Sequence, residues 1–192
     1  MQKSVDNSRF CEYDQNQGGD HMVNIQLLEQ EMKRKNVSNA DIAAALNIDI
    51  STWSRKKATT ESLFDEIERN NIEVYLGSMP AAKSASANIG NDYYIALDEQ
   101  SLESTAEARC RLAHEAGHCI TGSFYNLYAP LDRRSKHERR ADKWAVKKLI
   151  SKAELEVQLR QGLEPYELAE YFNVTEDFVH KALEFYFECG IA

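Results

Sequence analysis

The chain has 192 residues, of which 43% are hydrophobic and 28% charged, and a formal net charge of −8. This composition is typical of a globular protein with room for one domain and a small module, and no stretch approaches the roughly 18 consecutive apolar residues of a membrane helix. The first residues lack the apolar run of a signal peptide and the four cysteines are widely spaced without a CxxC pair, so we predict a cytoplasmic protein with reduced thiols and no membrane contact.

Two segments precede the predicted main domain. Residues 1–21 are polar and lack apolar periodicity, which predicts a disordered tail. Residues 22–58 show helical periodicity interrupted near Asn47, which indicates a partial helix-turn-helix segment. Its alternatives are DNA binding and a structural or partner-docking role. The side chains expected to reach phosphates and base edges, if it binds DNA, are Ser51, Thr52, Ser54, Arg55 and Lys56.

The charge distribution favours that small segment over the rest of the chain for any DNA contact. Residues 22–60 carry six Lys and Arg against four Asp and Glu, whereas residues 61–192 carry fifteen against twenty-three. An acidic body is not expected to present a nucleic-acid surface, because it repels phosphate.

The main domain, residues 61–192, is predicted to begin with a helix over 61–71. Two runs with the composition of strands follow, 72–78 and 92–98, separated by a segment that is expected to be flexible. The two runs are predicted to pair as a small antiparallel sheet. After them the sequence predicts a helix from about 105, a helix over 136–150 and two or three closing helices.

The motif His-Glu-x-x-His lies in the helix expected from about residue 105. Two histidines four residues apart, His114 and His118, stand one turn apart on one face of a helix and can bind one metal ion. Glu115 is rotated by about 100° from His114 and can act as a general base. The alternative is that both histidines are ordinary core or surface residues. Against it, the apolar face of this helix lies opposite the histidines, which places them in a cleft.

A third ligand is predicted twenty residues after the second histidine. On the helix over 136–150, Glu138 and Asp142 share the apolar, inward strip with Ala145 and Leu149. Buried carboxylates need a compensating cation, so Glu138 is predicted to bind zinc and Asp142 to orient a ligating histidine. A capping role for Glu138 and a surface role for Asp142 do not explain this alignment.

Two other features of the sequence have simpler interpretations. Cys110 lies eight residues before the second histidine, about 12 Å along a helix, which is too far to complete a closed zinc site. Residues 166–183 repeat the spacing of the helix-turn-helix segment, but their acidic side chains would repel phosphate, so we expect a packing or partner-binding role there.

Four stretches in order, "LFDEIERNNIEVYLG", "RCRLAHEAGHCITGS", "HERRADKWAVKKLI" and "YELAEYFNVTEDFVHKALEFY", resemble the ImmA/IrrE family of metallopeptidases. The resemblance implies an α+β, mainly helical, zincin-like domain with Zn²⁺ held by His114, His118 and Glu138 and with Glu115 as the base. It also implies an endopeptidase of a phage or mobile element that cleaves a helix-turn-helix repressor. Arg140 departs from the family pattern, where many members have a second acid.

Three functions remain open from the sequence. The first is the zinc endopeptidase. The second is a non-catalytic, zinc-containing regulator or antitoxin-like protein that binds DNA or a repressor; an intact Glu115 argues against it, because scaffolding needs no general base. The third is a structural zinc protein, which predicts that chelation unfolds the chain. Candidates for an oxyanion stabiliser are Tyr125, Tyr128 and His137.

Overall fold

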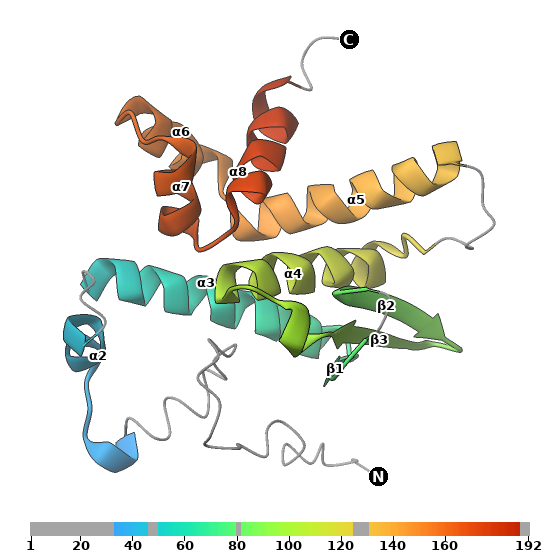
Figure 1. The fold of residues 1–192 in the computed structure, drawn as a ribbon, viewed down its shortest axis with the longest axis horizontal. Coiled ribbons are helices and arrows are strands. Elements are labelled where there is room, and N and C mark those ends of the chain that lie inside the picture. The colour runs from blue at the N-terminus through green and yellow to red at the C-terminus, as the bar shows by residue number, and fades with distance from the viewer. Residues whose placement is uncertain (1–32, 46–49, 80–81, 125–130, 189–192) are drawn as a thin grey trace.

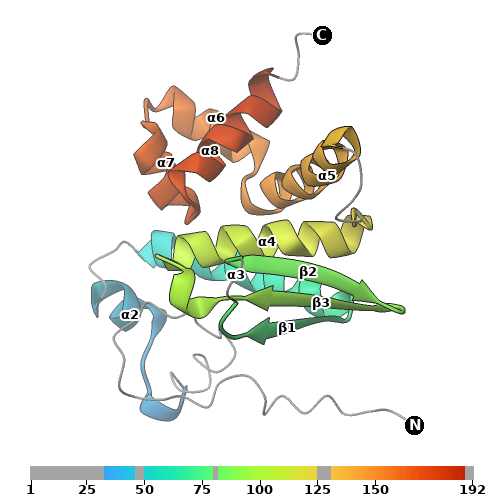
Figure 2. The same ribbon diagram turned by 45° about the vertical axis from the view of Figure 1, so that its right-hand side comes forward.

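The computed structural model describes residues 33–45, 50–79, 82–124 and 131–188. The expected tail over 1–21 and most of the first predicted helix lie outside these residues. Figures 1 and 2 show three tiers: a small sheet with helix α3 beside it, helix α4 in the middle, and helices α5 to α8 on the opposite side of α4. The fold is thus mainly helical with one small sheet, as predicted for an α+β domain.

The first described helices are α2 (Asn39–Ala45) and α3 (Ile50–Arg69). Ser38 begins α2, because its hydroxyl accepts a hydrogen bond from the Asp41 amide at 3.2 Å while the Asp41 carboxylate accepts from the Ser38 amide at 2.8 Å. Helix α3 is continuous through residue 61, so the prediction of a new helix beginning there is wrong. The end of the helix-turn-helix-like segment and the start of the main domain therefore share one helix.

The sheet has three strands in the order β1-β3-β2: β1 (Ile72–Leu76), β2 (Ser84–Ile89) and β3 (Asp92–Leu97). Strand β3 pairs in parallel with β1 and antiparallel with β2. The predicted antiparallel pairing of the first and last strand is wrong, because β2 forms within the segment expected to be flexible. Strand β2 was missed because its alternating residues are Ser and Ala, which give no apolar period. The two-residue Gly90-Asn91 turn, with φ of +72° at Gly90, was the available hairpin signal.

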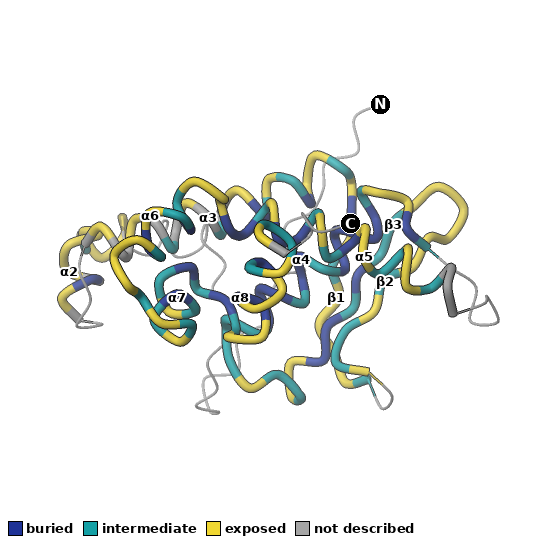
Figure 3. Tube along the Cα trace, turned by 90° about the horizontal axis from the view of Figure 1, so that it is seen from above, coloured by how far each residue is buried: buried dark blue, intermediate teal, exposed yellow. Residues whose placement is uncertain are grey.

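Helix α4 (Thr105–Thr121) is the centre of the core. Ser104 caps it by accepting from the Glu107 amide at 3.1 Å, and the helix begins at the position predicted from the sequence. Its apolar face packs on the sheet and on α3, and the side chains of Leu112, Ala113 and Ala116 are fully buried. Figure 3 shows that buried positions concentrate along the central elements, while α2 is mostly exposed.

Helix α5 (Leu131–Leu149) packs closely on α4. Gly117 makes this approach feasible, because a Cβ built there would lie 2.7 Å from the backbone oxygen of Ala141. The close contact brings the inward strip of α5 against the histidine face of α4. Ala145 and Leu149 of that strip are buried, as predicted from the helical spacing.

The closing elements are α6 (Lys152–Arg160), α7 (Pro165–Phe172), α8 (Glu176–Leu183) and a π-helical turn, η3 (Glu184–Glu188). The apolar residues of α7 and α8 belong to the core, which supports the packing role expected for residues 166–183. Arg109 of α4 fixes this pair: its buried guanidinium donates to the carbonyls of Phe172 and Asn173, both at 2.8 Å, at the end of α7.

Candidate metal centre

The two histidines of α4 point away from the core toward α5. His118 is 6% exposed and His114 is partly exposed, and their rings meet edge to face. Glu138 of α5 faces both: its carboxylate oxygens lie 3.2 Å from Nε2 of His114 and 3.5 Å from Nε2 of His118. The fold thus brings together the three residues that the sequence analysis singled out as ligands.

The hydrogen bonds of the outer ring nitrogens fix the tautomers of both histidines. Nδ1 of His118 lies 2.8 Å from the carbonyl oxygen of Ser123, to which it can only donate. Nδ1 of His114 lies 2.9 Å from the Asp142 carboxylate, the position predicted for this acid. Both Nε2 atoms are then bare acceptors, and they lie 3.2 Å apart beside a third acceptor, the Glu138 carboxylate. Three acceptors in mutual contact repel one another unless a cation lies between them.

A tetrahedral metal ion fits this arrangement. His114, His118 and Glu138 form a group whose ligand atoms all lie within 4.8 Å of one another. Ligands at about 2.0–2.1 Å from a tetrahedral zinc ion are separated by about 3.3 Å, close to the nitrogen–nitrogen and nitrogen–oxygen distances found here. Cys110 is not part of the group, because its thiol accepts a hydrogen bond from the Thr175 amide at 3.5 Å.

Asp142 links the centre to the last helix. Lys181 of α8 lies 3.0 Å from the same carboxylate oxygen that contacts His114. Although burial opposes it, hydrogen bonding to His114 and Lys181 lowers the pKa of Asp142. The Asp142 contact correspondingly raises the pKa of His114, against the opposing effect of burial. Asp142 is therefore held as a carboxylate that accepts from the outer nitrogen of His114.

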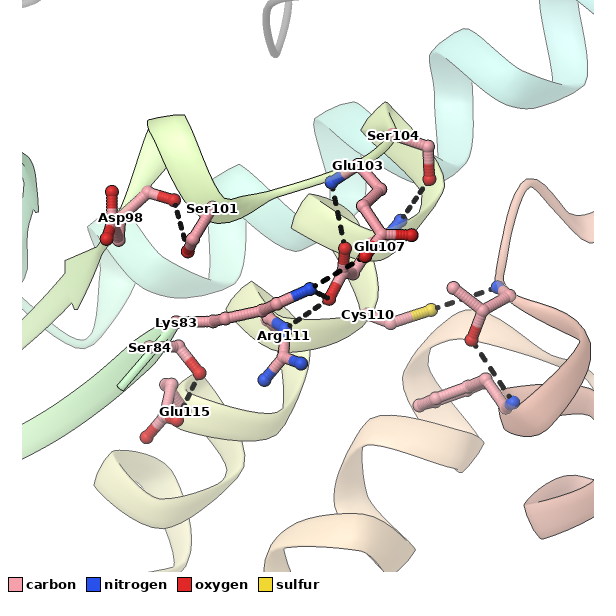
Figure 4. A network of polar contacts seen from close by, with 12 residues as sticks. Lys83, Ser84, Asp98, Ser101, Glu103, Ser104, Glu107, Cys110, Arg111 and Glu115 are labelled. Carbon is pink, nitrogen blue, oxygen red and sulfur yellow. Dashed lines mark hydrogen bonds and ion pairs between the residues drawn. The ribbon is translucent and has the colours of Figure 1, made fainter. Parts of the chain in front are cut away.

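Glu115 is buried beside the metal ligands, with 7% of its surface exposed. Its Oε1 accepts a hydrogen bond from the Ser84 hydroxyl at 2.8 Å, which joins the candidate base to strand β2 (Figure 4). The other oxygen, Oε2, makes no hydrogen bond within the described part of the chain. Glu115 thus has one oxygen fixed by the sheet and one left to accept a proton.

A cleft of about 610 Å³ runs from the metal ligands toward the start of α4, and charged side chains form much of its wall. Figure 4 shows Lys83 and Arg111 converging on Glu107, at 3.1 and 2.8 Å. Burial would raise the pKa of Glu107, but the Glu103 amide and the two cations lower it to about 2. Glu107 is therefore ionised across the physiological pH range.

None of the other predicted site residues that the structure describes belongs to the group of candidate metal ligands. Ser51 and Ser54 are exposed on α3 and Lys56 is half-buried, while the side chains of Thr52 and Arg55 lie outside the described part of the chain. Their DNA contacts stay a prediction. Of the oxyanion candidates, Tyr125 and Tyr128 also lie outside the described residues, and His137 is half-buried on α5.

Three residues that hold the site were not predicted from the sequence: Ser84, Ser123 and Lys181. Ser84 and Lys181 contact site residues that are far away in the sequence, and Ser123 acts through its backbone carbonyl. Sequence periodicity therefore gives no signal for any of the three. A serine two residues beyond the end of the motif helix is unremarkable in sequence, because its carbonyl, not its hydroxyl, holds His118.

Two histidines on one helix, a carboxylate on the next and a buried glutamate beside them define the class of metal-dependent hydrolases built on a His-Glu-x-x-His helix. The chain belongs to peptidase family M78, because its residues 67–184 match the IrrE N-terminal-like domain. No curated protein and no solved structure matches the chain significantly. No helix among the described residues is long and apolar enough to cross a membrane.

Proposed function

We propose that this protein is a zinc-dependent endopeptidase that acts in the cytoplasm. One observation carries the proposal: acceptor atoms of His114, His118 and Glu138 converge on one point, and the buried Glu115 lies beside them. Nitrogen and carboxylate ligands in a group of three suit zinc with one position left open. A scaffold or a closed structural site needs neither the open position nor Glu115.

The chemistry assigns one role to each side chain. When bound, zinc supplies Lewis acidity, which promotes ionisation of water and polarises a carbonyl group. Glu115 accepts a proton from the attacking water on Oε2 as the new carbon–oxygen bond forms. It then gives this proton to the amine nitrogen as the peptide carbon–nitrogen bond breaks. Asp142 holds His114 in the tautomer that leaves Nε2 directed at the metal.

Strand β2 is the edge on which an extended substrate is proposed to bind. Strand β3 cannot offer such an edge, because it is the central strand with a paired strand on each side. The backbone carbonyl of Lys83 accepts a hydrogen bond from the Asp98 amide at 2.9 Å. Because hydrogen-bonded positions alternate along an antiparallel pair, the backbone groups of Ser84 and Ser86 point outward. No strand among the described residues pairs with this edge. A substrate paired there would lie directly above Glu115.

The proposed substrate is a helix-turn-helix transcriptional repressor of a phage or other mobile element, whose cleavage would derepress its genes. This proposal rests on the family resemblance. The test is intact-mass analysis of the repressor encoded beside this gene, after incubation with the zinc-loaded protein and with its Glu115→Gln variant. We expect one new cut with the wild type and none with the variant, because the amide cannot accept a proton.

The variant must bind zinc at one equivalent and keep its far-UV circular dichroism for the comparison to count. Equal cutting by both proteins would contradict the role of Glu115. An intact repressor in both samples, together with tight binding between repressor and protein, would favour the non-catalytic regulator instead.

A further inference from the structure

The outer face of α5 carries a row of positive side chains. Lys136, Arg140, Lys143 and Lys147 follow at intervals of four, three and four residues, so they lie within about 60° of one another around the helix and span about 16 Å along it. Arg139 flanks the row. All five are exposed. We name these five residues the basic row.

The basic row gathers cations of the main domain that have no carboxylate partner among the described residues. Among the described side chains of residues 61–187, the following lysines and arginines lie within 4 Å of a carboxylate: Arg69, Lys83, Arg111, Lys148, Lys152, Arg160 and Lys181. Arg109 is buried against two carbonyls, and Arg134 has an interaction partner of its own. In the basic row, Arg139 donates to the Ser135 carbonyl at 3.1 Å and Lys143 lies 5.7 Å from the centre of the Phe185 ring. None of the five residues has a carboxylate partner among the described residues.

This arrangement is unfavourable for the helix alone. Like charges at i and i+4, as in Lys136 with Arg140 and Lys143 with Lys147, repel each other. The two described acids of the helix, Glu138 and Asp142, are turned toward the metal centre on the opposite face. A chain with net charge −8 has many carboxylates, yet none of those described compensates this face.

We propose that the basic row of α5 binds the phosphate backbone of a nucleic acid. Evenly spaced cations on a straight, exposed helix complement a regular line of negative charge. An acidic protein partner fits less well, because the described exposed large hydrophobic residues include none from α5, and a protein interface needs such residues at its centre. The contact is electrostatic and independent of base sequence.

This surface differs from the helix-turn-helix-like segment considered for DNA contact in the sequence analysis. The candidate DNA contacts of that segment, residues 51–56, lie at the start of α3. The basic row lies on α5, in the tier on the other side of α4 (Figure 1). The proposal also does not depend on peptidase activity, because the row faces away from Glu138 and Asp142.

The test compares two triple variants of the full-length protein that change the net charge equally. The first replaces part of the row, Arg140→Gln, Lys143→Gln and Lys147→Gln. The matched control replaces three exposed cations that have carboxylate partners, Arg69→Gln, Lys152→Gln and Arg160→Gln. Thermal unfolding and far-UV circular dichroism check that both variants fold.

Binding is measured by fluorescence anisotropy with a labelled duplex of about 24 base pairs and mixed sequence, between about 50 and 200 mM salt. We expect the row variant to lose at least about tenfold in affinity at the lowest salt and its log–log salt slope to fall by about 2 to 3. The control should remain within about twofold of the wild type.

Three results would overturn the proposal. Absence of duplex binding by the wild type at the lowest salt is the first. Equal losses in both variants would show an effect of net charge alone. Unchanged binding by the row variant would assign the contact to another surface, such as residues 22–58.

Discussion

At the scale of single residues, Asp142 sets which ring nitrogen of His114 is left to bind a metal ion. Its carboxylate fixes the tautomer and the orientation of the His114 ring. Removing such a hydrogen-bond partner from a ligating histidine typically weakens metal binding. We expect Asp142→Asn to weaken zinc binding roughly tenfold or more, measured by competition with a chromogenic chelator. Asp177→Asn is the matched control, because Asp177 is an exposed acid lining the same cleft. A similar loss in both variants would point to general electrostatics instead of the His114 contact.

Ser84 holds the candidate base from the neighbouring strand. A hydrogen bond to a charged group contributes about 1.5–3 kcal/mol, so we expect Ser84→Ala to lower kcat roughly tenfold with little change in KM. Ser84→Thr keeps a hydroxyl and should recover much of the rate. Ser86 lies on the same side of β2 and has no hydrogen bond to Glu115, so Ser86→Ala should retain near wild-type kinetics. Equal effects of the two alanines would assign the loss to the strand as a whole.

At the scale of elements, the contact between α4 and α5 assembles the metal centre, and Gly117 lies at its tightest point. A methyl group there would meet the backbone of Ala141, which cannot rotate away. We expect Gly117→Ala to lower the free energy of unfolding by about 1–3 kcal/mol in urea titration and to weaken zinc binding, because α5 must move outward. Gly77→Ala, where nothing lies within 4 Å, should change stability by less than about 0.5 kcal/mol. Full stability of Gly117→Ala would show that the helices adjust without cost.

Helices and strands differed in how well the sequence predicted them. The start of α4 was correct because Ser104 and Glu107 form a local cap, and the inward strip of α5 was correct because helical spacing alone sets it. Strand β2 was missed because its inward residues are serines, and the contact that Ser84 makes is with a helix residue 31 positions further along the chain. The order of the strands also could not be predicted, because pairing depends on partners and not on each strand's own sequence.

At the scale of the whole molecule, the buried apolar core does not include the three candidate metal ligands. The buried cluster spans α3, the sheet, α4, α5 and the closing helices, while the metal ligands lie on its border. We expect removal of zinc with a chelator to leave far-UV circular dichroism almost unchanged and to lower the melting temperature, because a bound ion stabilises only the folded state. Loss of helical signal on chelation would favour the structural zinc protein instead.

From the sequence alone we predicted the three candidate metal ligands, the candidate base and Asp142, because helical spacing orients residues up to a few turns apart and the motif joins chemistry to that spacing. Only the tertiary structure decided the order of the strands, the hydrogen bond from Ser84 to Glu115 and the reach of Lys181 to Asp142. These contacts join residues 31 and 39 positions apart. Their geometry depends on how whole elements pack, which local periodicity does not encode.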